Sequence, residues 1–213
     1  DSLPSRGLGD VYKRQTKVMH STGMSWELIV VDDGSDDGST TVIKELTNQD
    51  NIKCLLLAKN YGQTTAIQAG FDNAIGKYLV TLDSDLQNDP KDIPALLHKL
   101  IEEELDLVVG WRKNRKDNYF LRNLPSSIAN KLIGNITGVK LHDYGCSLKA
   151  YRADVLKEVR LYGEMHRFIP AWMATKIPAS KISELVVTHH PRIAGKSKYL
   201  SLIHISEPTR RKR

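Results

Sequence analysis

Residues 78–90 read Tyr-Leu-Val-Thr-Leu-Asp-Ser-Asp-Leu-Gln-Asn-Asp-Pro, an apolar run that ends in two carboxylates one residue apart. Residues 78–82 are apolar at nearly every position, which predicts a strand buried on both faces of a parallel sheet. Asp83 and Asp85 would follow its carboxyl end, where open α/β sheets bind ligands. Two carboxylates at this spacing suit a divalent cation that bridges to phosphates. The alternative is an ordinary polar turn, because Asp, Ser and Asn are common turn residues. The motif alone does not distinguish a cation site from a turn, so the other motifs of the chain are needed.

The sequence around this motif alternates strands with helices, which predicts an α/β fold with a doubly wound, mostly parallel sheet flanked by helices. Strands are predicted over 26–31, 52–58, 78–82 and 105–110, and helices over 39–48, 63–73 and 92–104. Pro90 fits the first turn of the last of these helices, because its missing N–H would have no partner there. Farther along, the predicted elements are helical segments over 119–136, 153–159 and 164–175, a short strand ending at Tyr151 and a strand over 182–189.

The two ends of the chain have an unusual relation at the level of DNA. Asp10–Gln15 and Leu200–Ile205 back-translate to strings that are reverse complements, and both resemble the transposon end of sequencing-library adapters. We therefore predict that residues 1–15 and 200–213 are non-native, adapter-encoded flanks and that residues 16–199 are the authentic domain. Such segments are excluded from reasoning about the fold.

Composition supports one globular domain and no nucleic-acid partner. The flanks carry net charges of +1 and +3, which leaves +2 of the formal +6 for residues 16–199. No basic stripe with interleaved aromatic residues is present. Cys54 and Cys146 are too few for a disulfide framework, and no apolar run is long enough to span a bilayer.

A second acidic stretch, Asp32–Thr40, follows the predicted strand over 26–31. An EF-hand calcium loop is rejected, because Lys44 stands where the bidentate Glu should be and a strand precedes the loop. A strand-to-helix crossover is the better interpretation. It places Asp32 at the carboxyl edge of the sheet, where it can accept hydrogen bonds from a base or ribose.

Several motifs in this order resemble glycosyltransferase family 2 with the GT-A fold. They are Val30–Ser35, Asn60–Gly62, Asp83–Pro90, the pair Arg112 and Arg115, and His190–Tyr199. The last three resemble the branch that loads a sugar onto a polyprenyl phosphate, as dolichyl-phosphate mannose synthases do. The resemblance covers residues 22–199 and is specific because the spacing of several motifs agrees.

The sequence departs from this family at both ends. Family members begin with a nucleotide-contacting strand that is absent here, so the resemblance implies a truncated catalytic domain without its first strand. Many members of the branch continue into membrane-associated helices where this chain enters the flank that begins at Leu200. The resemblance thus implies a parent protein at the cytoplasmic face of a membrane, attached through segments that this chain lacks.

The resemblance implies an inverting transfer of a sugar from a UDP-sugar or GDP-mannose to undecaprenyl or dolichyl phosphate. Asp32, Asp33, Asp83 and Gln87 are the expected nucleotide-sugar contacts, and Asp85 with Asp83 would hold Mg²⁺ or Mn²⁺ against the departing diphosphate. The basic and hydroxyl side chains expected to bind the acceptor phosphate are Arg112, Arg115, Ser127, Arg192, Lys196, Ser197 and Lys198.

Asp143 matches the position of the family's base. A phosphate monoester is already largely ionised near neutral pH, with a second pKa of about 6, so Asp143 is interpreted as orienting groups more than abstracting a proton. The alternative is a turn cap before Gly145. His166, His189 and His190 have no partners at metal-site spacing, so they are interpreted as structural or acceptor-side residues and no zinc site is predicted. Met165, Phe168, Ile169, Trp172 and Met173 recur at helical spacing and are predicted to be mostly core, with an apolar surface that meets lipid as the alternative.

Three other functions remain open at the level of sequence. The first is a family 2 enzyme with a carbohydrate acceptor, such as a cell-wall or capsule transferase. The second is a nucleotidyltransferase, and the third is an inactive nucleotide-binding module. The basic tail and the acceptor arginines favour the lipid-phosphate transferase over all three.

Overall fold

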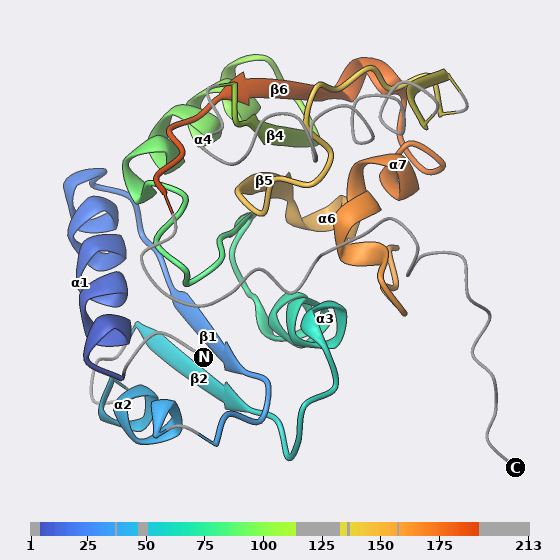
Figure 1. Cartoon of the computed structure of the whole chain (residues 1–213). Helices are drawn as coiled ribbons and strands as arrows, with labels where there is room; N and C mark the ends of the chain where they lie inside the picture. Colours follow the sequence, from blue (N-terminus) through green and yellow to red (C-terminus); the bar gives the residue numbers. More distant parts are fainter. Residues whose placement is uncertain are drawn as a thin grey trace, which may run out of the picture.

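The computed structural model describes residues 5–36, 38–46, 51–113, 133–135, 137–156 and 158–191. Its amino-terminal half contains a two-stranded parallel sheet with Leu28 opposite Ile52 and Asp32 opposite Leu56 (Figure 1). The elements of this half are α1 (Ser5–Ser21), β1 (Leu28–Asp32), α2 (Ser39–Leu46), β2 (Ile52–Leu56) and α3 (Gln63–Asn73). The predicted order of strand, helix, strand and helix over residues 26–73 is therefore confirmed.

A second sheet of four strands, in the order β3-β5-β4-β6, forms the other half of the molecule. The strands are β3 (Tyr78–Thr81), β4 (Leu107–Trp111), β5 (Lys149–Arg152) and β6 (Ile182–Val186). The helical elements are η1 (Pro90–Asp92), α4 (Ile93–Glu102), α6 (Ala153–Leu156), η2 (Met165–Phe168), α7 (Ile169–Met173) and η3 (Ala179–Lys181). Most of the predicted helix over 119–136 lies outside the described residues.

The four-stranded sheet is mixed, which the sequence pattern did not predict. β4 pairs parallel with β6, but β5 lies between β3 and β4 and is antiparallel to both. The prediction that residues 78–82 are buried on both faces is also wrong, since every residue of β3 is only half-buried. The reason is that β3 is an edge strand: within the described residues it pairs with β5 alone. The expected absence of a first strand stays a prediction.

The main hydrophobic core lies between the four-stranded sheet and its helices. Residues 107–109 of β4 are fully buried, and α4 packs on this core through Ile93, Leu96, Leu97 and Leu100, as its periodicity predicts. Ile169 and Met173 are buried in the same core, with Met165 and Trp172 packed against it, which confirms the predicted core role of this segment.

Helix α3 connects the two halves, since it contacts β1 and also η2 (Figure 1). A Cβ placed on Gly70 would lie 3.7 Å from the Val31 side chain, so the helix reaches contact distance with the strand. Phe71 meets the Tyr151 ring of β5 edge-on at 5.5 Å between centroids. The close approach predicted from the small residues of this helix is thus confirmed at Gly70.

A smaller core lies under the two-stranded sheet. It joins Val30, Ile43 and Ile52 with Tyr12 of α1, which is 5% exposed. Tyr12 falls within residues 1–15, so this predicted flank contributes a side chain to the packing. The adapter origin of residues 1–15 and 200–213 concerns the source DNA and stays a prediction. Within the described residues, no helix has the length and apolar character needed to cross a membrane.

Candidate functional site

The two carboxylates of the Asp83–Asp85 motif lie on the tight loop after β3. The Asp85 carboxylate accepts the backbone N–H of Gln87 at 3.0 Å, and Leu86 between them has a left-handed φ of +62°. Asp83 accepts the side-chain amide of Gln63 at 2.9 Å. Burial, followed by the charge of Asp85, raises the pKa of Asp83 above its ordinary value. The loop therefore concentrates negative charge that a cation would relieve.

The carboxylates of Asp32, the last residue of β1, and of Asp33, the residue after it, both hold loops. Asp32 is 5% exposed and accepts the N–H of Ser35 at 3.1 Å and the hydroxyl of Thr40 at 2.7 Å. Asp33 accepts the N–H groups of Tyr61 and Gly62 at 2.7 and 2.8 Å. Both residues lie at the predicted edge of the sheet, and their roles toward a nucleotide stay predictions.

Gly34 lets the loop after β1 meet the loop after β2. Its φ is +70°, and a Cβ at this position would lie 2.4 Å from the carbonyl carbon of Lys59. Any side chain would force the two backbones apart. The acidic stretch Asp32–Thr40 and the turn Asn60–Gly62, which the sequence presents as separate motifs, therefore form one surface.

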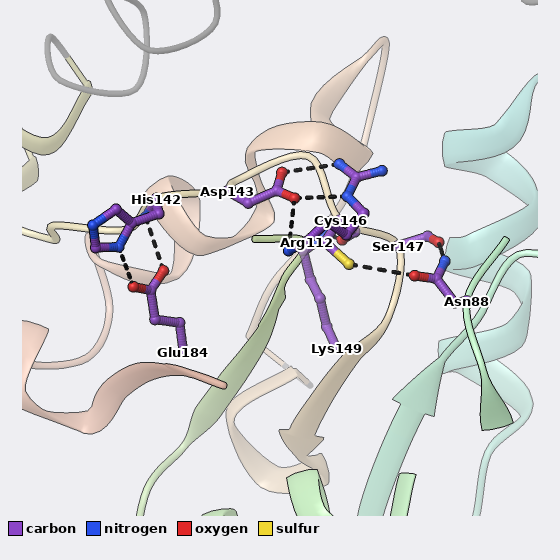
Figure 2. A network of polar contacts seen from close by, with 8 residues as sticks. All are labelled: Asn88, Arg112, His142, Asp143, Cys146, Ser147, Lys149 and Glu184. Atoms are coloured by element: carbon purple, nitrogen blue, oxygen red, sulfur yellow. Dashed lines mark hydrogen bonds and ion pairs between the residues drawn. The ribbon is translucent and has the colours of Figure 1, made fainter. Parts of the chain in front are cut away.

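Arg112 and Asp143 form a two-pronged ion pair at the end of β4 (Figure 2). The guanidinium donates through Nε to Oδ2 at 2.6 Å and through Nη2 to Oδ1 at 2.9 Å, and the backbone N–H of Arg112 adds a contact of 3.4 Å. Each side chain is only 11% exposed. Although burial opposes the charge of Arg112, the hydrogen bonds and charge of Asp143 raise the pKa of Arg112. The predicted base and one predicted phosphate ligand are thus partners of each other.

A network of polar groups behind this pair was missed by the sequence reasoning (Figure 2). The Asn88 amide donates to the Ser147 hydroxyl at 2.9 Å, and the Thr81 hydroxyl donates to the Ser147 carbonyl at 2.7 Å. Lys149 of β5 is 3% exposed, and its ammonium donates to the Cys146 carbonyl. A lysine inside the otherwise apolar run Leu148–Tyr151 is the sequence signal that should have indicated it.

The loop of residues 87–89 meets the end of β6. The Gln87 carbonyl accepts the N–H of His190 at 2.7 Å, and the His190 ring lies 3.2 Å from the Asp89 carboxylate. Asn88 pairs with His189 in an isolated bridge. The segment that follows β6 is thereby brought beside the acidic motif.

The remaining predicted site residues, which are those expected to bind the acceptor phosphate, lie outside the described residues. They are Arg115, Ser127, Arg192, Lys196, Ser197 and Lys198. His166 is buried and shares a hydrogen bond of 2.7 Å with the Thr64 hydroxyl, which favours the structural one of the two roles predicted for it. Among the residues that the structure describes, no group of three or more His, Cys, Asp or Glu side chains is placed to hold a metal.

An α/β fold with an Asp-x-Asp loop after a strand is the arrangement that the resemblance to GT-A proteins predicts. The profile of "Glycosyl transferase family 2" matches residues 11–160, which is most of the chain, so the protein belongs to this family. The predicted family and fold are confirmed.

One relative indicates which branch of the family this chain resembles. Dodecaprenyl-phosphate galacturonate synthase from Rhizobium johnstonii is 54% identical over 196 residues, which are 91% of this chain and 58% of the relative. The chain thus spans less than two thirds of that protein.

Solved structures agree on the fold. Glucosyl-3-phosphoglycerate synthase from Mycobacterium tuberculosis matches with a TM-score of 0.64 and 16% identity, over 85% of this chain and 68% of that protein. The same enzyme with Mn²⁺ and uridine-diphosphate-glucose matches with a TM-score of 0.58 and 18% identity, over 78% of this chain and 61% of that protein. A further structure of that enzyme contains Mg²⁺ and uridine-diphosphate.

Proposed function

We propose that the protein from which this chain comes is an inverting glycosyltransferase that moves a sugar from a nucleotide diphosphate sugar to a polyprenyl phosphate. The observation that carries the proposal is the 54% identity to a dodecaprenyl-phosphate galacturonate synthase, combined with an acidic loop and an Arg–Asp pair at one sheet edge. The transfer takes place at the cytoplasmic face of a membrane.

Asp85 and Asp83 are the proposed ligands of Mg²⁺ or Mn²⁺. They would supply carboxylate oxygens, the type of ligand that such hard divalent cations prefer. Burial, followed by the charge of Asp85, raises the pKa of Asp83, and a bound cation would favour the ionised carboxylate against both effects. When bound, the ion neutralises the departing nucleoside diphosphate.

Arg112 and Asp143 act on the acceptor side. With both oxygens of Asp143 accepting from the guanidinium, that carboxylate is a poor proton acceptor. A phosphate acceptor does not need a base, because its monoester is largely ionised near neutral pH. Asp143 therefore orients Arg112, whose remaining N–H groups bind the acceptor phosphate. Arg115, Ser127, Arg192, Lys196, Ser197 and Lys198 are proposed as further phosphate contacts.

Asp32, Asp33, Asp83 and Gln87 are proposed to line the nucleotide-sugar side. Of these, Asp32 and Asp33 already hold the loops at Ser35 and at Tyr61–Gly62, so their substitution should disturb donor binding through loop position as well as direct contact. For the transferred sugar, the relative's name makes galacturonate the first candidate, with glucose and mannose as alternatives.

The test uses membranes that contain the full-length protein encoded by the source gene. They are incubated with Mg²⁺, undecaprenyl phosphate and one radiolabelled donor at a time: UDP-galacturonate, UDP-glucose or GDP-mannose. Label in the organic phase from one donor, absent with an Asp85→Asn variant, is the expected result. Transfer to water-soluble glycans instead would establish a carbohydrate acceptor, and donor binding without transfer would indicate a nucleotide-binding module.

A further inference from the structure

The residues that precede Arg112 and Asp143 in the chain also contact each other. The indole ring of Trp111 stacks on the imidazole ring of His142, with 4.0 Å between the ring centroids and an angle of 14° between the ring planes. Trp111 is the last residue of β4, and His142 begins the stretch of residues 142–148 that leads to β5. Two consecutive residues of one segment therefore meet two consecutive residues of the other, once through stacked rings and once through an ion pair.

His142 is held from a second side by Glu184 of β6 (Figure 2). The backbone N–H of His142 donates to Oε2 of Glu184 at 2.8 Å, and the ring Nδ1 shares a hydrogen bond with Oε1. Glu184 is opposite Val109 in the parallel pair of β4 and β6, and Trp111 lies two residues beyond Val109. Since alternate side chains of a strand share a face, Trp111 and Glu184 belong to the same face of the sheet, and both reach His142.

The His142 side chain makes these contacts without being buried. It is 63% exposed, whereas the Glu184 side chain is 18% exposed. A ring so exposed removes little apolar area from water, so burial is not the main effect of its contacts. Stacked rings and hydrogen bonds impose a definite geometry, and the residue that directly follows is Asp143.

The contacts of His142 join the segment that carries Asp143 to the sheet. The hydroxyl of Tyr144, the next residue along, donates to the Val139 carbonyl, and that bond is internal to residues 139–144. The contacts of His142 reach β4 and β6 instead. The stack therefore ties the backbone of Asp143 to the end of the same strand that carries its guanidinium partner.

We propose that His142 and Trp111 are positioning residues for sugar transfer. Their stack sets the place at which the Arg112–Asp143 pair meets the acceptor phosphate, and neither ring touches a reacting atom. The proposal rests on the proposed function for the acceptor that it serves. Loss of the stack should lower kcat/KM for the lipid phosphate by a factor of about 10 to 100, the order expected when a binding group is displaced by up to about 1 Å. The donor KM should not change, because hydrogen bonds of other loops hold the nucleotide side.

The experiment compares full-length His142→Ala, His142→Phe and Trp111→Leu with the wild type in the radiolabel assay. His142→Ala removes the ring, whereas His142→Phe keeps a ring that can stack and the backbone N–H that donates to Glu184. His20→Ala is the matched control, because His20 is also an exposed imidazole against an indole ring, that of Trp26, at 5.0 Å between centroids. Its contact lies at the end of α1, away from the ion pair.

A double-mutant cycle determines whether the stack acts through the ion pair. Both kcat/KM for undecaprenyl phosphate and Tm are measured for His142→Ala, Asp143→Asn and the double variant. If the stack acts through the pair, the double variant has nearly the kcat/KM of Asp143→Asn, and its loss of Tm is smaller than the two single losses added together. A merely structural role would give additive losses of Tm and would raise the donor KM as well.

The proposal is supported by a loss of at least about tenfold in kcat/KM in His142→Ala and Trp111→Leu, with most of it recovered in His142→Phe and with coupling to Asp143→Asn. If Trp111→Leu does not fold, the variants of the exposed His142 decide. Additive losses in the cycle, or a kcat/KM in His142→Ala equal to that in His20→Ala, would overturn it. If the wild type places no label in lipid, the proposed function fails, and the Tm cycle, which needs no acceptor, still decides whether the stack acts on the ion pair.

Discussion

Replacing Asp143 by Asn tests whether this residue orients Arg112 or removes a proton. The substitution keeps the shape of the side chain but leaves the guanidinium without its negative partner. Both side chains are 11% exposed, so the pair is closer to a buried than to a surface ion pair. Removing one partner of a buried pair costs about 3–5 kcal/mol, against about 0–1 kcal/mol at the surface. The residual exposure of Arg112 favours the lower end, about 3 kcal/mol.

The assay is thermal unfolding of the full-length protein, with Asp72→Asn as the matched control. Asp72 pairs with Arg160 at 2.9 Å, but those side chains are 48% and 74% exposed. In a domain of about 150–250 residues, each kcal/mol shifts Tm by about 2–4 °C, so Asp143→Asn should lower Tm by about 6–12 °C and Asp72→Asn by less than about 4 °C. Equal shifts in the two variants would contradict the buried character of the Arg112 pair.

Kinetics then distinguish orientation from base catalysis. If Asp143 acts through Arg112, Asp143→Asn and Arg112→Met lower kcat/KM for the lipid phosphate similarly, and the double variant is little worse than either single variant. The acid limb of the pH profile of kcat should persist in Asp143→Asn. Disappearance of that limb with a loss of about 10²–10⁴ in kcat, while Arg112→Met retains it, would refute the orienting role and establish a base.

Three further predictions concern single residues. Asp85→Asn should abolish metal-dependent transfer with little change in Tm, and full activity in the radiolabel assay would remove it from the metal site. Gly34→Ala should lower Tm by several degrees, because its Cβ would lie 2.4 Å from the Lys59 carbonyl carbon at a φ of +70°; an unchanged Tm would contradict that contact. Burial lowers the pKa of His166, so the unfolded chain binds its proton more readily and stability falls as pH drops through about 6.5. Denaturant titrations at pH 7.5 and 5.5 measure the free energy of unfolding. Its decrease at the lower pH should be smaller in His166→Asn, which keeps a polar group near Thr64, than in the wild type.

The sequence predicted local elements well because their signals are local. Helix α3 was expected over 63–73 and is found at Gln63–Asn73, where polar residues after a turn start it and small residues pack it on β1. The acidic motif was expected after a strand and lies directly after β3. Hydrophobic periodicity and turn residues act within a few residues of each other, so the sequence alone predicts the elements that they form.

Long-range pairing was not recoverable from the same signals. β5 is inserted between β3 and β4, although about 40 residues separate it from β4 in sequence, and nothing in Lys149–Arg152 specifies its neighbours. The pairing of Arg112 with Asp143 is a consequence of that insertion, since it brings the end of β4 beside the loop that precedes β5. The sequence indicated Arg112 as a phosphate contact and Asp143 as the residue at the position of the family's base, but it could not show that the two bind each other.

The nucleotide side and the metal side of the proposed site are joined through one short segment. Asp33, after β1, holds the N–H groups of Tyr61 and Gly62, and the next residue, Gln63, donates to Asp83 after β3. β1 and β3 belong to different sheets, so these contacts, along with α3 itself, connect the two loops directly. A change at Asp33 should therefore alter the position of Gln63 and, through it, of Asp83. For this reason the acidic residues after β1 matter to the proposed metal site even though none of them needs to touch the ion.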